Sequence, residues 1–171
     1  NIITFDNLTS EFFGNKYLKN FMEFKLFYKL FIDKTSYLLR SMGININTSP
    51  VLDLRVKGAS NIIGNRSFGE NKLQVARLSA AYMKGMQDNG VLECAKHFPG
   101  HGDTDKDSHH TLPVIRHNKH RLNKIEMYPF KYLINKGLGS VMVAHLKIPS
   151  IDATKNLASS LSDKVVNNIL K

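Results

Sequence analysis

The chain has a single cysteine, no long hydrophobic run and fewer acidic than basic residues. Cys94 cannot form a disulfide within the chain, and the apolar run around it indicates a small core residue. No uninterrupted apolar stretch approaches the roughly 20 residues of a membrane-spanning helix. The chain begins with neither an initiator Met nor a signal-peptide pattern, so we expect a processed or truncated start from which targeting cannot be read.

The charge balance raises the question of a polyanionic partner, because 24 Lys and Arg against 14 Asp and Glu give a formal net charge of +10. The lysines are scattered, however, with apolar residues between them at helical spacing, as in residues 15–29. This distribution is typical of solvated helix faces, whereas a nucleic-acid interface gathers its cations in one patch or stripe. We therefore expect neither nucleic acid nor a membrane as a partner.

Helix and strand signals alternate along the chain. Gly43 and Gly90 each follow a helical pattern, where a left-handed residue commonly ends a helix. The longest helix is expected to bury one stripe of side chains: Phe24, Phe27, Phe31, Leu38 and Met42. The predicted elements are a helix at 19–42, an extended segment at 44–54, a helix at 71–88, a strand at 91–98, a helix at 128–136, a strand at 140–145 and a helix after Ser162.

This alternation predicts a parallel α/β fold and suggests a (β/α) barrel, in which chemistry gathers at the carboxyl ends of the strands. Asp53 ends the first extended segment, Lys96 and His97 end the second, and His145 ends the third. A full barrel takes about 250 residues, and this sequence offers three strands. We predict a partial (β/α)8 TIM-type barrel with parallel strands, in which residues 1–171 form one partial domain without a second domain or repeat.

Residues 95–115, AKHFPGHGDTDKDSHHTLPVI, lead from the second strand into a loop rich in histidine, aspartate and glycine. His97 and His101 have the spacing of two metal ligands on a helix, but Pro99 and the glycines argue against a helix there. No clustered thiols support a zinc site. We expect no metal and no cofactor, and a metal-dependent hydrolase ranks as a lower alternative. Three further residues could contribute to such a site: Asp107, His109 and His110.

The simplest interpretation of this region, without a functional role, is an exposed polar loop, since Gly, Asp and Ser favour turns. His110, His117 and His120 are interpreted in that way. Lys96 and His97 differ from them because they end an apolar strand that is expected to be buried. Polar side chains at such positions usually have a structural or functional role.

Asp107, Ser108 and His109 offer a proton-transfer pair. Residues i and i+2 of an extended segment project to the same side, so Asp107 can accept a hydrogen bond from one ring nitrogen of His109 while the other faces a substrate. A carboxylate neighbour orients an imidazole and raises its pKa, which suits a group that acts first as acid and then as base. The spacing alone also occurs by chance.

The motif KHFPGHGDTDKDSHHTLPV, residues 96–114, resembles the signature of glycoside hydrolase family 3, in its β-N-acetylhexosaminidase (NagZ-like) branch. Residues 43–54 (GININTSPVLDL) resemble the strand before that family's substrate loop. Residues 62–71 (IIGNRSFGEN) resemble its arginine loop, and residues 140–152 (SVMVAHLKIPSID) resemble its next strand. The resemblance spans residues 42–162.

The resemblance implies a role for five residues. His109 matches the family's unusual histidine general acid/base, and Asp107 matches the aspartate that pairs with it. Arg66, Lys96 and His97 match residues that bind the terminal N-acetylglucosamine, and Lys and Arg side chains donate fixed hydrogen bonds to sugar hydroxyls.

The implied function is hydrolysis of terminal non-reducing β-linked N-acetylglucosamine from cell-wall or chitin-type glycans by a retaining mechanism, with a His-Asp pair replacing one of the usual two carboxylates. The resemblance favours a monomeric complete enzyme and a cytoplasmic location, although relatives can be exported. Two alternatives stay open. One is phosphorolysis, because a histidine repels an anionic acceptor less than a carboxylate does, and the other is an inactive fragment that only binds sugar.

Two family features are absent from the sequence. The D-x-E-G-G segment is expected upstream of this chain, and the aspartate nucleophile is expected beyond Lys171. We therefore expect the 171-residue chain alone to be inactive. The histidine-rich loop is interpreted as a mobile arm to which Gly100 and Gly102 give freedom to close over the sugar.

Overall fold

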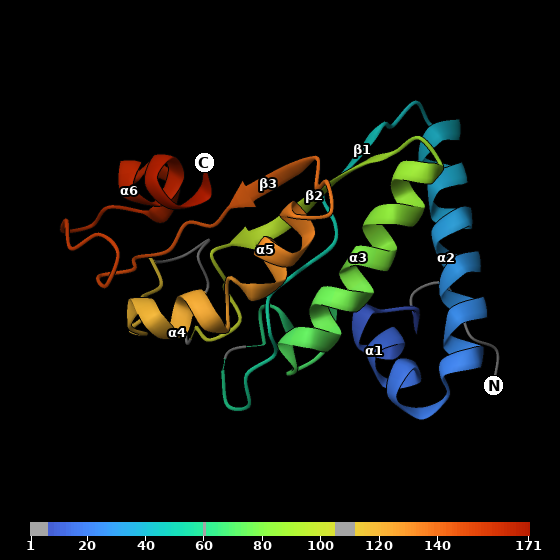
Figure 1. Cartoon of the computed structure of the whole chain (residues 1–171), viewed down its shortest axis with the longest axis horizontal. Coiled ribbons are helices and arrows are strands. Elements are labelled where there is room, and N and C mark those ends of the chain that lie inside the picture. Colours follow the sequence, from blue (N-terminus) through green and yellow to red (C-terminus); the bar gives the residue numbers. More distant parts are fainter. Residues whose placement is uncertain (1–6, 60, 105–111) are drawn as a thin grey trace.

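The computed structural model describes residues 7–59, 61–104 and 112–171. Within them, no helix is both long and apolar enough to span a bilayer. Helices α1 to α3 lie at one end of the molecule and α4 and α6 at the other, with the strands between them (Figure 1). The elements in chain order are α1 (Ser10–Lys19), α2 (Phe21–Ser41), β1 (Ile46–Asn47), α3 (Lys72–Asp88), β2 (Leu92–Phe98), α4 (Lys119–Lys124), α5 (Tyr128–Ile134), β3 (Ser140–Val143) and α6 (Asp163–Val165).

The three strands form a parallel sheet in the order β1-β2-β3. Ile46 pairs with Leu92, and Cys94 pairs with Ser140. The predicted parallel α/β class is confirmed. Since the strands run in the same direction, the residues that follow β2 and β3 emerge at one edge of the sheet.

The first strand is much shorter than the extended segment predicted at residues 44–54, because only Ile46–Asn47 form regular strand. Beyond it the chain still runs along β2, where Lys96 N donates to Pro50 O (3.1 Å) and Leu52 N donates to Lys96 O (2.6 Å). Pro50 has no N–H to contribute, and a proline interrupts a regular ladder. This irregular stretch leads directly to Asp53.

Two clusters of buried side chains form the core. One covers the sheet and α5 and includes Leu52, Phe98 and Phe130. The other joins α1, α2 and α3 and includes Leu54 and Phe13. Leu52 and Leu54 belong to different clusters, so the residue between them, Asp53, lies where the two parts of the core meet.

The buried face of α2 differs from the predicted one. Its apolar side chains occur almost all the way round the helix, so their spacing does not select one face. Phe24 is buried as predicted. The helix buries four residues spaced four apart: Phe24, Tyr28, Ile32 and Ser36. Three residues predicted as buried are exposed instead: Phe27, Leu38 and Met42.

All four predicted helices are confirmed, and two further helices of the described residues, α1 and α4, were missed. The predicted helix at 71–88 is α3, and the predicted N-cap Ser162 accepts from Val165 N. The sequence gives no clear signal for α1, whose interior contains Gly14, or for α4, which has six residues. The expected core residue Cys94 is only partly buried.

Gly14 lies where α1 touches the chain at Phe68, and a β-carbon at residue 14 would lie 1.9 Å from Phe68 O. Gln74 holds this contact, since its Nε2 donates to Gly14 O (3.1 Å) and Phe68 O (2.8 Å). Gly-to-Ala changes within helices usually stabilise by about 0.5–1 kcal/mol. Here we expect Gly14→Ala to lower the free energy of unfolding by roughly 1–3 kcal/mol, because the overlap is with backbone.

Urea unfolding of both proteins measures this difference. Asn15→Ala is the matched control, because Asn15 is the next residue of the same helix and is exposed. Its free energy of unfolding should stay the same or rise slightly. An equal or higher stability of Gly14→Ala would contradict the close contact between α1 and Phe68.

Candidate functional site

The strand-end residues singled out in the sequence lie at the carboxyl edge of the sheet. Lys96 and His97 are in the last part of β2, and the backbone of Leu52 pairs with Lys96. This places Asp53 beside His97, and His145 follows the end of β3. Ligands of parallel α/β sheets bind at this edge, so it is where a candidate site belongs.

Asp53 is the most constrained of these residues. It is 1% exposed, and its carboxylate accepts from His97 Nδ1 (2.6 Å) and from the backbone N–H of His101 (2.6 Å). The backbone N–H of His97 contributes a longer contact of 3.3 Å. Because the carboxylate only accepts, Nδ1 of His97 carries the proton. The His97 ring is thereby held in one orientation, with Nε2 as its basic nitrogen.

His101 lies against this pair and is 4% exposed. Thr104 Oγ1 donates to His101 O (3.1 Å), so Nδ1 of His101 donates to the same hydroxyl oxygen (3.0 Å). Burial lowers the pKa of the His101 imidazole, and the positive charge of Arg66 also acts in that direction. His101 is therefore a neutral, packed histidine at the start of the loop.

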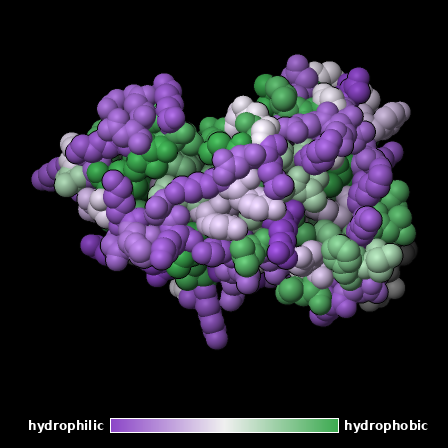
Figure 2. All heavy atoms as spheres, viewed as in Figure 1, coloured by the Kyte–Doolittle hydropathy of each residue, from purple (hydrophilic) through white to green (hydrophobic). Residues whose placement is uncertain are grey.

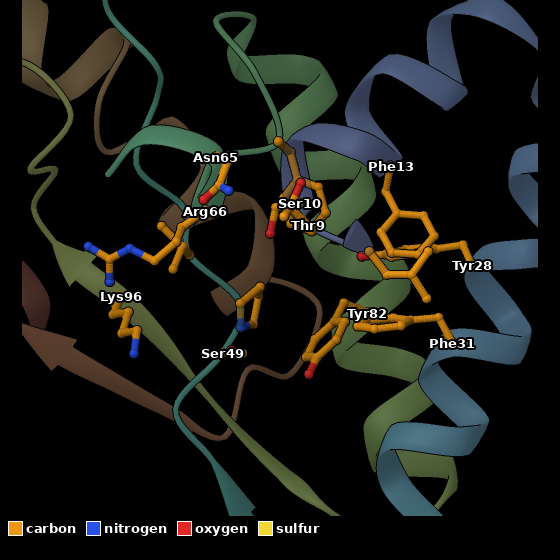
Figure 3. A pocket seen from close by; sticks show the side chains of 14 residues that line it. Thr9, Ser10, Phe13, Tyr28, Phe31, Ser49, Asn65, Arg66, Tyr82 and Lys96 are labelled. Carbon is orange, nitrogen blue, oxygen red and sulfur yellow. The ribbon is translucent and has the colours of Figure 1, made fainter. Parts of the chain in front are cut away.

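Lys96 and Arg66 are 30 residues apart in the sequence, and the fold brings their side chains together. Both side chains line the same cavity, and they lie next to each other in Figure 3. Burial lowers the pKa of Lys96, and the charge of Arg66 adds to this effect. Lys96 Nζ donates to Thr48 Oγ1 (3.3 Å), and Arg66 Nη2 donates to Ile62 O (2.6 Å). The two cations thus present several N–H donors to one space.

The cavity has a volume of about 260 Å³. Its polar end carries Lys96, Arg66 and Asn65, and its other end is aromatic (Figure 3). Tyr82 belongs to the aromatic end, and burial raises the pKa of its phenol to about 12, so it stays protonated at neutral pH. Asn47 Nδ2 donates to Tyr82 Oη (2.7 Å). The remaining aromatic residues of this end are Phe13, Tyr28, Phe31 and Phe68.

The structure brings some predicted site residues together and leaves others outside its description. Lys96 and Arg66 share the cavity, whereas His97 does not line it and pairs with Asp53 instead. Asp107 and His109 lie outside the described residues. Across residues 7–59, 61–104 and 112–171, no three His, Cys, Asp or Glu side chains are grouped as metal ligands.

Three residues depart from, or add to, the sequence interpretation. The sequence placed Asp53 at the end of a strand and assigned it no role. Its pairing with His97 could have been inferred from the position of His97 at the end of the neighbouring strand β2. His117 is not a plain loop residue, because Nε2 donates to Asp103 (2.6 Å) and the side chain is 18% exposed. His145 is exposed and contacts Ser160 Oγ through Nδ1 (2.7 Å).

A parallel sheet with polar side chains gathered at the carboxyl ends of its strands is an arrangement typical of enzymes. Residues 24–171 match the Glycosyl hydrolase family 3 N terminal domain. The chain belongs to glycosyl hydrolase family 3, and the relatives that it matches there are β-hexosaminidases.

Two relatives illustrate the sequence similarity. The chain is 40% identical over 118 residues to Beta-hexosaminidase A of Pseudoalteromonas piscicida. The matched region covers 68% of this chain and 20% of that protein. It is 41% identical over 115 residues to Beta-hexosaminidase of Thiobacillus denitrificans, covering 67% of this chain and 32% of the relative. The chain thus spans about a fifth to a third of the length of these relatives.

Solved structures resemble the fold closely. A family 3 β-N-acetylglucosaminidase from Paenibacillus sp. str. FPU-7 is 40% identical with a TM-score of 0.81, covering 85% of this chain and 27% of that one. NagZ from Neisseria gonorrhoeae in complex with N-trifluoroacetyl-D-glucosamine is 32% identical with a TM-score of 0.86, covering 95% of this chain and 47% of that one. The three parallel strands therefore match part of the family 3 structures.

The neutral state of His101 has a consequence for stability. Its pKa in the folded chain is below the ordinary 6.5, so protons bind the unfolded chain more tightly. Stability from this group is fully present above about pH 6.5 and is lost as the pH falls toward the folded-state pKa. We expect the free energy of unfolding to fall more steeply between about pH 7 and pH 5.5 in the native chain than in His101→Asn.

Urea unfolding across that pH range measures the two slopes. Asn is the suitable replacement because its amide can retain the contact that Nδ1 makes with Thr104. Asn15→Ala serves as control, because it changes an exposed side chain that does not titrate and should retain the native slope. Equal slopes for the native chain and His101→Asn would mean that His101 is not held neutral by burial.

Proposed function

We propose that this chain supplies part of the active site of a β-N-acetylglucosaminidase, which releases terminal non-reducing β-linked N-acetylglucosamine from cell-wall or chitin-type glycans. The observation that carries the proposal is the shared cavity of Arg66 and Lys96 next to a His97 ring fixed by Asp53. Membership of family 3 supports it, as does the relative that binds an N-acylated glucosamine.

The proposed architecture is a partial (β/α)8 barrel in which β1, β2 and β3 are consecutive strands, and residues 1–171 belong to a single catalytic barrel domain. The parallel order of the strands supports this arrangement. So does the position of the polar residues, since barrel enzymes place their chemistry at the carboxyl ends of the strands.

Arg66, Lys96 and His97 are proposed to bind the sugar. A pyranose presents hydroxyl oxygens at several angles, and the guanidinium and ammonium groups provide donors at two separate points of the cavity wall. His97 is proposed to contribute Nε2, which can accept from a sugar hydroxyl because Nδ1 donates to Asp53. The fixed ring costs less conformational entropy on binding than a mobile one.

Proton transfer is proposed for Asp107 and His109, which lie between the described residues Thr104 and Leu112. The support for this step is the Asp-Ser-His sequence within the family motif. In a retaining reaction His109 would donate a proton to the departing glycosidic oxygen, and would then remove one from the incoming water. Asp107 would orient the ring throughout both steps.

Lys96→Ala tests the sugar-binding role in the complete protein. Loss of a charged hydrogen bond costs about 1.5–3 kcal/mol, so the Kd of N-acetylglucosamine should rise roughly 10- to 150-fold. Isothermal titration calorimetry measures this Kd. Lys84→Ala is the control, because Lys84 is exposed and pairs only with Asp88 among the described residues. An unchanged Kd in a folded Lys96→Ala protein would assign Lys96 a structural role.

His109→Ala tests the proton donor. Hydrolysis of methyl N-acetyl-β-glucosaminide, which has a poor leaving group, should fall by roughly 10²–10⁴. The 4-nitrophenyl glycoside needs little protonation, so its first step should be much less affected and a glycosyl-enzyme should accumulate. Asp107→Ala should produce a milder loss of the same kind, because the imidazole remains.

Steady-state and burst kinetics on the two glycosides measure these effects, with and without phosphate to distinguish hydrolysis from phosphorolysis. His120→Ala should leave both rates unchanged, because His120 is an exposed residue of α4. Equal losses on the two glycosides in His109→Ala would show that His109 is not the general acid.

A further inference from the structure

Four charged or polar side chains form a cluster outside the cavity, which we call the loop-base cluster: Asp103, His117, Arg121 and Glu126. His117 Nε2 donates to Asp103 Oδ2 at 2.6 Å and lies 3.8 Å from Glu126 Oε1. Arg121 bridges both carboxylates, with Nη2 3.4 Å from Asp103 and Nε 3.2 Å from Glu126. The cluster is therefore one connected network.

The network joins the two chain segments that flank residues 105–111. Asp103 lies just before this segment and His117 follows it, so the 2.6 Å contact connects residues 14 positions apart. Arg121 belongs to α4, and Glu126 lies between α4 and α5. The cluster thus ties both ends of the loop to the helical part that follows.

Each of these two flanking segments is also fixed by contacts of its own. On the first side, a β-carbon on Gly102 would lie 1.8 Å from Leu54 O, so the backbone there is packed directly on the segment that carries Asp53. On the second side, Ser150 Oγ donates to His117 O (2.7 Å), and Ile115 N donates to Lys147 O (2.9 Å). The cluster connects these two fixed segments and so sets the distance between them.

Stability alone does not account for this arrangement. Glu126 and His117 have side chains that are 8% and 18% exposed, and taking charges out of water carries a desolvation penalty. Apolar residues of similar volume often replace a buried ion pair without loss of stability. What such a network adds is directional contact, because each hydrogen bond fixes distance and angle.

We propose that the loop-base cluster positions the acid/base segment, with His117 and Asp103 as the positioning residues. This inference rests on the proposed function, since it takes His109 as the proton donor. Proton transfer requires hydrogen-bond distance to the reacting oxygen, and a displacement of about 1 Å can cost on the order of 10²-fold in rate. The distance between residues 103 and 117 sets where the chain segment that carries His109 begins and ends.

The test compares His117→Ala and His117→Gln in the complete protein, using methyl and 4-nitrophenyl N-acetyl-β-glucosaminide. His117→Ala should lose about 10- to 100-fold in kcat on the methyl glycoside, with much less effect on the first step of the 4-nitrophenyl glycoside. His117→Gln should recover most of the loss, because its amide N–H can replace Nε2 as the donor to Asp103. A merely structural role would not produce this dependence on the leaving group.

The Kd of N-acetylglucosamine is measured on the same variants and should stay unchanged, because the cluster does not line the cavity of Arg66 and Lys96. Asp152→Asn is the matched control. Asp152 is also a carboxylate in a polar network, since it accepts from Ser162 Oγ (2.7 Å) and Thr154 Oγ1 (2.8 Å), and it should not alter the ratio of the two rates.

Equal losses on both glycosides, or an unchanged ratio in a folded His117→Ala protein, would overturn the inference. If that variant does not fold, Asp103→Asn is measured by the same ratio and decides the question. His109→Ala, run in parallel, separates the two proposals. A selective loss in His109→Ala without one in the cluster variants rejects only the positioning role, whereas no selective loss in His109→Ala rejects the proposed function and the inference with it.

Discussion

The buried carboxylate of Asp53 is the constraint on which the candidate site depends. A charge removed from water requires hydrogen-bond donors, and Asp53 obtains them from His97 and from the backbone N–H of His101. The end of β2 and the start of the loop are thereby fixed to the segment after β1. Since the two neighbours of Asp53 pack into different parts of the core, this one residue also relates the helices α1 to α3 to the sheet.

Local patterns predicted the fold class and most elements, and they failed where long-range packing decides. The alternation of helices and strands was sufficient for a parallel α/β fold, and glycines marked the ends of the long helices. The face of α2 was assigned wrongly because its apolar residues surround the helix. β1 is short because Ser49 N donates back to Asn47 O (2.8 Å) and Pro50 has no N–H to donate, and the sequence does not display this local turn.

The candidate site was predictable in its parts and not in its connections. Lys96 stood out as a cation at the end of an apolar strand, and the family resemblance added Arg66. The pairing of Asp53 with His97 spans 44 residues, and that of Asp103 with His117 spans 14. No spacing rule covers such distances, because they depend on how the chain returns to the sheet. For this reason His117 resembled an ordinary loop histidine until its partners were seen.

The glycines of the loop have a meaning beyond conformational freedom. A side chain at residue 102 would overlap the backbone of Leu54, and one at residue 100 would press against Glu126. Part of the family motif therefore records how closely two segments of backbone approach each other. These glycines are therefore required by the packing of the chain, independently of the chemistry of the residues that follow them in the motif.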